Sequence, residues 1–419
     1  MKIAILTNFT DFNPGYSLTG IVQDQVRMLK EHGHEVHLFV SEKCNKKSFP
    51  AELDLEMKVP FGHLVDYHSR SELTKDHEML VKSVRAMIIN ELPSYDMVFT
   101  HDWVFTGWNL PYALGIIDAS RDEAIKNVRW LHWIHSIPTS GYDWWSIREY
   151  GPKHRLVYPN KSDSIRVAEA YRGFPKDVRV VPHIKDLRSW FDFSEETCKF
   201  INQYPGVMHA DIVQILPASV DRLEAKRVRE VILLFKHLKS MGRSVCLVIA
   251  NQWATTKTHK ESIMHYKKIA HRNGLVPDEE VIFTSDFGKQ YEVGIGKRML
   301  RELFQCSNLF IFPTREETFG LVIPEASLAG GVMMVLNKSL QMQIEISGFN
   351  CLYFDFGSYC HHFTANDENA YFKDIAMLTL GRMQRDEAIA MKTFMRQRYN
   401  WDYLHDNYYA PIMSESEIW

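Results

Sequence analysis

The sequence predicts an α/β protein with two doubly wound parallel sheets that face a cleft. Three observations carry this prediction. The chain has 419 residues, which is enough for two or three cores. Short apolar runs alternate with amphipathic helical stretches. A turn-rich segment near residue 205 separates two such series. No apolar run approaches the ~18 residues that would span a bilayer.

The first series begins at the N-terminus. Residues 3–6 are apolar, residues 22–29 repeat apolar side chains at helical spacing, and residues 34–40 form another apolar run, which together predict a βαβ unit. The parallel sheet is expected to continue through apolar runs at 97–100, 128–134, 156–158 and 178–181. We therefore expect a first domain over residues 1–205. The first apolar run lacks a cleavage site, which favours a buried strand over a signal peptide and predicts a cytoplasmic protein.

The second series begins near residue 206. Its expected strands and helices are strands at 212–216, 245–250, 281–284 and 309–312, and helices at 228–241, 260–273, 300–306 and 323–329. This alternation predicts a second domain over residues 206–395, and the helical stretch 396–419 is expected to pack back on the first domain. Because ligands of doubly wound sheets bind beyond the carboxyl ends of the strands, we expect the chemistry in the loops that follow the strands.

The densest group of polar residues lies between positions 312 and 326. A predicted strand ends there in a loop that carries Glu317, and a helix begins near Gly320 with Glu325 about one turn inside it. The unpaired amides and the positive dipole end of a helix start suit phosphate or sugar oxygens. Both glutamates are expected to accept hydrogen bonds from hydroxyls; the alternative is a helix cap and a solvated side chain.

This stretch resembles the Glu-x7-Glu signature of retaining GT-B glycosyltransferases of the family-4 type, in the context Pro-x-x-x-Glu-x-Phe-Gly-Leu-x-x-x-Glu-Ala-x-x-x-Gly. The resemblance extends to residues 33–36 and 180–183 and so covers nearly the whole chain. It implies two Rossmann-like domains and the transfer of a sugar from a nucleotide-sugar donor to an acceptor hydroxyl, with retention of the anomeric configuration.

The resemblance also implies roles for single residues. Glu317 is expected to contact the donor sugar and Glu325 to hold the nucleotide ribose. The backbone amides of Phe319, Gly320 and Leu321 are expected to approach the sugar and the phosphate.

Arg222 and Lys226 lie where a predicted strand leads into a helix. Two cations there would neutralise a leaving diphosphate without a metal. The alternative is a pair of surface cations. In similar enzymes a glycine follows the lysine, whereas Arg227 follows it here. Since no Asp-x-Asp motif occurs, we expect no metal and no bound cofactor.

The first domain carries weaker candidates. Gly15 lies in the loop after the first strand and is expected to approach a phosphate; turn chemistry is the alternative. His135 follows a strand end and is expected near the donor sugar, because similar enzymes place a histidine there. His132 is the alternative residue for this role, and the pair His101-Asp102 at another strand end is a weaker candidate.

Six of the ten tryptophans lie between positions 103 and 145. They are expected either to pack in the core or to form a platform for sugars or bases, with Trp133, Trp144 and Trp145 as acceptor-side candidates. The net charge of −3 provides no global attraction for nucleic acid. The segment 148–188 nevertheless has ten basic and five acidic residues, typical of a solvated face or of a site for an acidic acceptor.

The acceptor therefore stays open. A carbohydrate or lipid-linked acceptor is favoured, and a hydroxylated base in nucleic acid is the alternative. A non-catalytic protein that binds nucleotide sugars or glycans is a further alternative.

Overall fold

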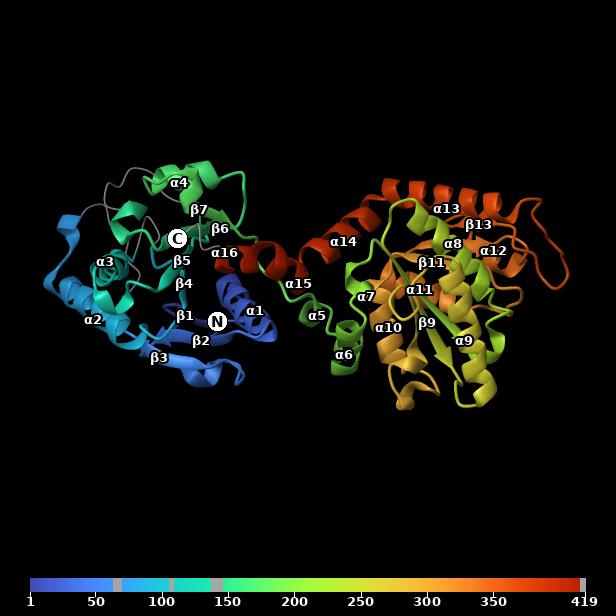
Figure 1. Ribbon diagram of the computed structural model, residues 1–419, viewed down its shortest axis with the longest axis horizontal. Helices are drawn as coiled ribbons and strands as arrows, with labels where there is room; N and C mark the ends of the chain where they lie inside the picture. Colours follow the sequence, from blue (N-terminus) through green and yellow to red (C-terminus); the bar gives the residue numbers. More distant parts are fainter. Residues whose placement is uncertain (63–69, 105–108, 137–145, 415–419) are drawn as a thin grey trace. The chain divides into compact units, whose positions relative to one another are not determined.

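The computed structural model describes residues 1–62, 70–104, 109–136 and 146–414, and it divides into two compact units (Figure 1). Unit 1 comprises Met1–Asp186 together with the C-terminal segment that begins at Trp401, and unit 2 comprises Leu187–Asn400. Within these described ranges, no helix is both long enough and apolar enough to cross a membrane.

Unit 1 is built on a seven-stranded parallel sheet with the order β3-β2-β1-β4-β5-β6-β7. Its strands are β1 (Lys2–Leu6), β2 (Glu35–Ser41), β3 (Leu55–Val59), β4 (Met97–His101), β5 (Arg129–Trp133), β6 (His154–Tyr158) and β7 (Val178–Val180). The chain first adds strands on one side of β1 and then crosses to the other side with β4. The point where the winding reverses therefore lies between β1 and β4.

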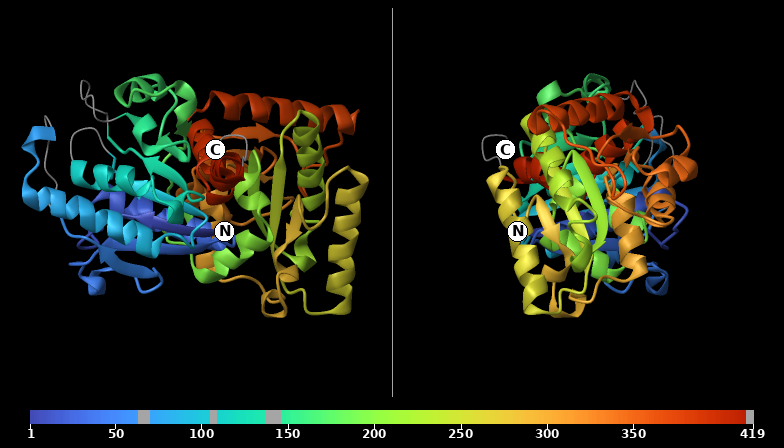
Figure 2. Two further views of the ribbon diagram at one scale, coloured as in Figure 1. Left: turned by 60° about the vertical axis from the view of Figure 1, so that its left-hand side comes forward. Right: turned by 90° about the vertical axis from the view of Figure 1, so that its right-hand side faces the viewer.

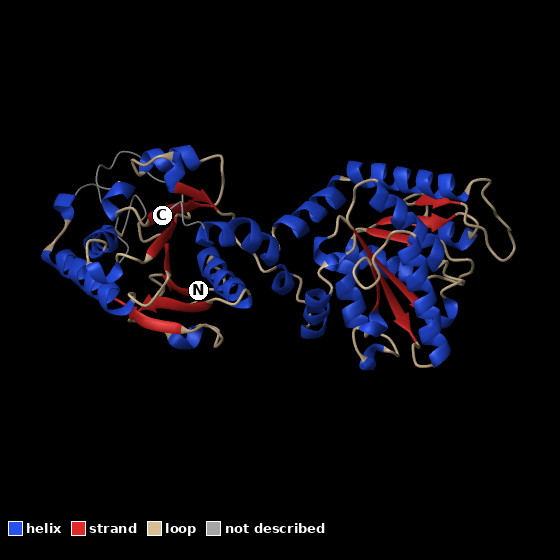
Figure 3. Cartoon of the chain, in the orientation of Figure 1, coloured by secondary structure: helices blue, strands red, loops and turns tan. Residues whose placement is uncertain are grey.

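Helices cover both faces of this sheet (Figure 3). They are α1 (Ser17–Glu31), α2 (Lys75–Glu91), α3 (Leu110–Ala119), α4 (Ser164–Ala170), α15 (Trp401–Leu404) and α16 (Ala410–Ser414). Ile3 and Ile5 of β1 belong to the core under α1, α15 and α16, whereas Ala4 and Leu6 belong to the core under α2, α3 and α4. Since successive side chains of a strand point to opposite faces, the continuous apolar run of β1 requires cover on both sides.

Unit 2 contains two three-stranded parallel sheets, β10-β9-β8 and β11-β12-β13. The strands are β8 (Ile212–Ser219), β9 (Val245–Gln252), β10 (Val281–Phe283), β11 (Leu309–Phe312), β12 (Met333–Asn337) and β13 (Leu352–Phe354). The helices are α5 (Leu187–Trp190), α6 (Glu195–Gln203), α7 (Gly206–His209), α8 (Val228–Ser240), α9 (Lys257–Arg272), α10 (Lys297–Cys306), α11 (Val322–Gly330), α12 (Gln341–Ser347), α13 (Glu368–Arg385) and α14 (Glu387–Arg398). Helices α8 and α13 lie side by side (Figure 2).

Side chains join the two sheets of unit 2 between β8 and β11. The Gln214 amide nitrogen donates to the Ile311 carbonyl at 2.8 Å, and its oxygen accepts from the Ile311 N–H at 2.9 Å. The Asn308 side chain accepts from the Val213 N–H at 2.9 Å. Winding in unit 2 thus reverses between β8 and β11. The α/β fold class predicted from the sequence, with parallel doubly wound sheets, is confirmed.

The unit boundaries differ from those expected from the sequence. The first boundary lies at 186/187 and not at 205/206, because Phe200, Ile201 and Tyr204 belong to the hydrophobic core of unit 2. The chain returns to unit 1 at residue 401 and not at 396. The buried Arg396 guanidinium donates to the carbonyls of residues 208 and 210, which fixes the end of α14 on unit 2.

Glu302 of α10 joins α10 to α6 in the interior of unit 2. Its fully buried carboxylate accepts hydrogen bonds from the Ser194 hydroxyl at 2.7 Å, the Ser194 N–H at 3.0 Å, the Thr197 hydroxyl at 2.5 Å and Arg298 Nε at 2.6 Å. Burial alone raises the pKa of Glu302, but these hydrogen bonds outweigh burial and lower the pKa to about 2.

We predict that Glu302→Gln lowers the free energy of unfolding by about 3 kcal/mol at pH 7, since the pKa falls by a little over two units on folding and each unit corresponds to about 1.4 kcal/mol. The folded pKa lies below the unfolded value of about 4.3, so this stabilisation is present above pH ~4.3 and is lost as the pH falls towards 2. Thermal unfolding at pH 7, 5 and 3.5 measures the difference. The control is Glu195→Gln, whose exposed carboxylate pairs with Lys199. A deficit that does not shrink at pH 3.5 would contradict this explanation.

Candidate functional site

The loops that follow β8 and β11 meet at the carboxyl ends of these strands in unit 2. The Arg315 N–H donates to the Ala225 carbonyl at 2.7 Å, and the Thr314 hydroxyl donates to the same oxygen at 3.3 Å. Ligands of doubly wound sheets bind at such a reversal of the winding. The two loops therefore form one side of a candidate site.

Lys226 and Glu317 form an ion pair across these loops. Lys226 Nζ lies 2.5 Å from Glu317 Oε2, and the side chains are only 12% and 20% exposed. The same ammonium lies 4.9 Å from the centroid of the Phe312 ring. Burial raises the pKa of Glu317, but the hydrogen bond from Lys226 and the Lys226 charge lower it by more. The net effect is a pKa below the usual value. Glu317 is therefore ionised at neutral pH and compensates the Lys226 charge.

Arg222 forms a second ion pair, with Glu316, that is nearly half exposed. Both cations expected from the sequence thus lie beside the loop after β11. Arg227 follows Lys226 and adopts a left-handed backbone conformation with φ 54°. Glycine adopts this conformation without strain, so Arg227 has the backbone geometry that a glycine would have at the start of α8.

Three backbone amides lie free at the start of α11. In the part of the chain that the structure describes, the N–H groups of Phe319, Gly320 and Leu321 have no hydrogen-bond acceptor. Gly320 has φ 76°, and the helix begins at Val322. The neighbouring Thr318 N–H donates to Glu317 Oε1 at 3.1 Å. The amides thus follow the Lys226–Glu317 pair closely in the chain and belong to the positive end of the helix dipole.

Glu325 lies in the first turn of α11 and is exposed. It lines a hollow of about 360 Å³ with Lys297, Leu300, Arg301, Phe304, Leu328 and Ala329. No hydrogen bond or ion pair among the described residues joins Glu325 to Glu317 or Lys226. The structure thus shows no direct link between the two glutamates of the motif.

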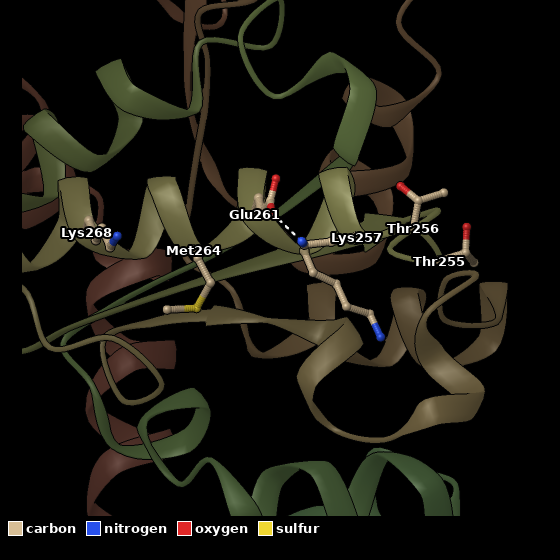
Figure 4. Close-up of a pocket in the computed structure, with 7 residues that line it drawn as sticks. Thr255, Thr256, Lys257, Glu261, Met264 and Lys268 are labelled. Carbon is tan, nitrogen blue, oxygen red and sulfur yellow. Dashed lines mark ion pairs between the residues drawn. The ribbon is translucent and has the colours of Figure 1, made fainter.

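A further hollow of about 520 Å³ lies along α9 (Figure 4). It is lined by Thr255, Thr256, Lys257, Lys260, Glu261, Met264 and Lys268. Lys257 pairs with Glu261 at 3.8 Å within the helix, and Lys260 pairs with Glu292 at 2.7 Å. These are surface cations with surface partners, and we assign no site to them.

Unit 1 has a cavity of about 520 Å³ between the loops after β1 and β4, where its winding reverses. The described residues that line it are Asn8, Phe9, Thr10, Asp11, Tyr16, Leu18, Thr19, Phe61, Gly62, His101, Asp102 and Asn109. Asp102 is buried, has φ 55° and accepts the His135 N–H at 3.0 Å. Burial raises the pKa of Asp102 to about 6 despite this hydrogen bond.

His135 belongs to a chain of hydrogen-bonded imidazoles. Its Nε2 lies 2.8 Å from His101 Nδ1, and its Nδ1 lies 3.1 Å from His183 Nε2. His101 Nε2 contacts the Gln25 amide oxygen at 2.9 Å, which assigns a proton to that nitrogen and makes His135 and His183 donors through Nε2. Burial lowers the pKa of all three histidines, that of His135 to about 3. The imidazoles are therefore uncharged at neutral pH.

The alternative candidate His132 lies in the core. It is fully buried between the Thr100 hydroxyl at 2.8 Å and His154 Nδ1 at 2.9 Å. The Gly15 amide donates to the Asn13 side chain at 2.9 Å, so its hydrogen bond serves the turn and is not free for a phosphate.

The expectation that Trp133 meets an acceptor is wrong. Trp133 is 2% exposed and packs against Phe99 and Tyr409, and Trp103 and Trp130 are buried as well. A buried indole offers no face for stacking. Trp130 and Trp133 belong to the central strand β5, and each packs in the core on one of the two faces of the sheet. Trp144 and Trp145 lie outside the described residues.

One group of metal-ligand type occurs among the described residues. Ligand atoms of His32, His405 and Asp406 lie within 4.8 Å of one another. The two imidazoles stack with centroids 3.8 Å apart and planes inclined by 16°. Lone pairs of stacked rings do not converge on one ion, so we assign no metal to this group.

Sequence reasoning missed Gln25 and Asn109 and ranked Asp102 low. Gln25 lies inside an amphipathic helix and gave no signal. Asp102 and Asn109 both have positive φ, at 55° and 59°, and aspartate and asparagine are the residues that most often accept this conformation after glycine. The available signal was therefore an aspartate directly after the end of β4 and an asparagine directly before α3.

No protein-family model matches the chain, and no curated protein matches it. Several solved structures are similar. A glycosyltransferase from Rickettsia africae ESF-5 is 14% identical over 100% of this chain and 98% of that chain, with a TM-score of 0.37. Anabaena Alr3699/HepE in complex with UDP-glucose is 15% identical over 99% and 100%, with a TM-score of 0.33. WaaG, a glycosyltransferase involved in lipopolysaccharide biosynthesis, is 14% identical over 99% and 100%, with a TM-score of 0.33.

We predict that Asp102→Asn stabilises the protein by roughly 3 kcal/mol at pH 8 and has little effect at pH 4, since the pKa of Asp102 rises by about two units on folding and each unit corresponds to about 1.4 kcal/mol. The folded pKa of this acid is raised, so folding stability falls as the pH rises from about 4 to about 6. Asparagine keeps the acceptor for the His135 N–H and tolerates the positive φ. Thermal unfolding against pH measures the effect, with the exposed Asp11→Asn as control. Destabilisation at pH 8 would contradict it.

Proposed function

We propose that the chain is a glycosyltransferase that takes a sugar from a nucleotide-sugar donor, with the diphosphate of the donor bound in unit 2. The observation that carries the proposal is the Lys226–Glu317 pair beside three free amides where the winding reverses. Cations and amides together suit a diphosphate, and a carboxylate suits sugar hydroxyls. The Glu-x7-Glu resemblance supports the same assignment.

Lys226 and Glu317 have different roles in the proposed reaction. An arriving diphosphate competes with Glu317 for the Lys226 ammonium, and Arg222 lies close enough to assist once it leaves Glu316. The amides of residues 319–321 stabilise the charge that develops on the leaving phosphate oxygen. Glu317, released from Lys226, accepts hydrogen bonds from the sugar and positions it.

We propose retention of the anomeric configuration on the resemblance. The acceptor hydroxyl attacks the anomeric carbon on the face that the diphosphate leaves, the bond from that carbon to the phosphate oxygen breaks, and the departing phosphate takes the hydroxyl proton. Side chains and amides supply the positive charge that stabilises the leaving diphosphate, so we further propose a metal-independent reaction. As a separate proposal, carried over from the sequence expectation, the protein acts in the cytoplasm.

We predict that a nucleoside diphosphate raises the melting temperature of the wild type and that Lys226→Ala abolishes the rise. Saturation a hundredfold above the dissociation constant corresponds to about 2.7 kcal/mol of stabilisation. Thermal unfolding with UDP, GDP, TDP, ADP and CMP, each with and without EDTA, measures the shift. Lys268→Ala on α9 is the matched control and is expected to keep it. No shift with any nucleotide would overturn the proposal.

We predict the opposite result for Glu317→Gln. This substitution removes the carboxylate that competes for Lys226, so the shift with the diphosphate is expected to equal or exceed that of the wild type. Sugar transfer, in contrast, is expected to fall at least tenfold in kcat/KM, because the sugar loses its positioning group. Titration calorimetry and a kinetic assay measure the two effects. Loss of diphosphate binding together with activity would contradict this division of roles.

A further inference from the structure

The cavity of unit 1 offers hydrogen-bond acceptors that have no partner in the described part of the chain. Asn109 is 2% exposed, and its amide nitrogen donates to the Asp102 carbonyl at 3.2 Å. Because that carbonyl only accepts, the orientation of the amide is fixed, and the Asn109 oxygen is left as a buried acceptor without a partner among the described residues. The side-chain oxygen of Asn8 is likewise buried and unpaired.

Asp102 adds a third acceptor to this cavity. One carboxylate oxygen accepts the His135 N–H, and no hydrogen bond among the described residues reaches the other. The carboxylate of Asp11 is exposed at the same cavity. Both nitrogens of His101 are occupied, by Gln25 and by His135, so this imidazole offers no further hydrogen bond to a ligand.

Positive groups are scarce around the same cavity. None of its described lining residues is lysine or arginine. The nearby Lys43 does not line it; its ammonium lies 4.0 Å from the centroid of the Phe61 ring. The start of α1 at Ser17 offers backbone amides, but the carboxylates of Asp11 and Asp102 line the same cavity. A phosphorylated ligand would therefore meet repulsion from Asp11 and Asp102, and no lysine or arginine among the described lining residues would offset it.

Part of the cavity lining is apolar. Phe9, Phe61 and Tyr16 supply aromatic surface, and the volume of about 520 Å³ lies within the range of about 300–1,000 Å³ that is usual for small-molecule sites. Buried acceptors without partners each destabilise the folded chain, which a ligand with matching hydrogen-bond donors would relieve. Sugars combine several hydroxyl donors with apolar C–H faces that pack on aromatic rings.

We propose that this cavity binds an unphosphorylated carbohydrate, neutral or bearing an amine, whose hydroxyl or ammonium groups donate to Asp102, Asn109 and Asn8. The proposal rests on the proposed function in one respect: in a glycosyltransferase this ligand is the acceptor. The basic segment 148–188 is compatible with an acidic acceptor. We propose instead an acceptor that carries no phosphate.

Saturation-transfer NMR on the full chain tests the proposal. The probes are glucose, methyl glucoside, glucosamine, a neutral disaccharide and glucose 6-phosphate. At least one unphosphorylated sugar is expected to receive saturation, and glucose 6-phosphate is expected to receive at least fivefold less. Asp102→Asn is expected to reduce the signal at least fivefold, because an amide in place of the carboxylate weakens the hydrogen bonds. The surface variant Asp118→Asn on α3 is the control and is expected to retain it.

Equal or stronger binding of glucose 6-phosphate would overturn the proposal, as would unchanged binding in Asp102→Asn. Binding of UDP, GDP, TDP, ADP and CMP, measured in the same samples, separates the two proposals. If one of these nucleotides binds and no sugar does, the cavity assignment is wrong while the proposed function stands. If sugars bind through Asp102 and no nucleotide binds, the cavity assignment stands and the proposed function is wrong.

Discussion

The Gln214 amide is the interaction on which the candidate site of unit 2 depends. It replaces a backbone ladder between β8 and β11 and holds these strands as neighbours. The loops that carry Lys226 and Glu317 extend from the ends of those two strands, so the register that Gln214 fixes also sets the position of the ion pair. A fully buried amide is suited to this task, because it satisfies one N–H and one carbonyl that would otherwise be unpaired.

The two units repeat one topology with different chemistry. In each, the winding reverses between two neighbouring strands, and polar side chains collect in the loops beyond their carboxyl ends. Unit 2 gathers free amides and two cations that are paired with glutamates there, which suits an anion that displaces the glutamates. Unit 1 gathers uncharged imidazoles, carboxylates and unpaired amide oxygens, which suits hydroxyl or ammonium groups. The electrostatic difference between the units matches the difference between a nucleotide diphosphate and a sugar.

Much of the fold follows from the sequence, because continuous apolar strands and amphipathic helices have periods that local side chains reveal. β1, β8 and β11 lie where their apolar runs predict them. The apolar runs do not predict the strands β3, β12 and β13. The unit boundary was misplaced because the segment around Phe200 looks irregular in the sequence while its side chains complete the core of unit 2.

The sequence predicts only those site residues that lie within a short stretch next to a recognisable strand. The loop with Glu317 and the cation Lys226 are adjacent to recognisable strand ends, and their side chains meet as an ion pair. The histidine chain depends on Gln25, His101 and His183, which are far apart in the sequence, and only the order of the strands brings them together. The same holds for the burial of Trp133, since aromatic residues in a βα protein suit a core as well as a ligand surface.

The most direct test of the proposed function follows the sugar–phosphate bond itself. The nucleotide sugar whose nucleotide raises the melting temperature would be incubated with the chain and an unphosphorylated sugar, and proton and phosphorus NMR would record the release of that nucleotide and the configuration of the new glycosidic bond. We predict that the nucleotide is released and that the product has the anomeric configuration of the donor, with no turnover in Lys226→Ala. An inverted product would contradict the retaining mechanism, and turnover that persists unchanged in Lys226→Ala would contradict the assignment of the site in unit 2.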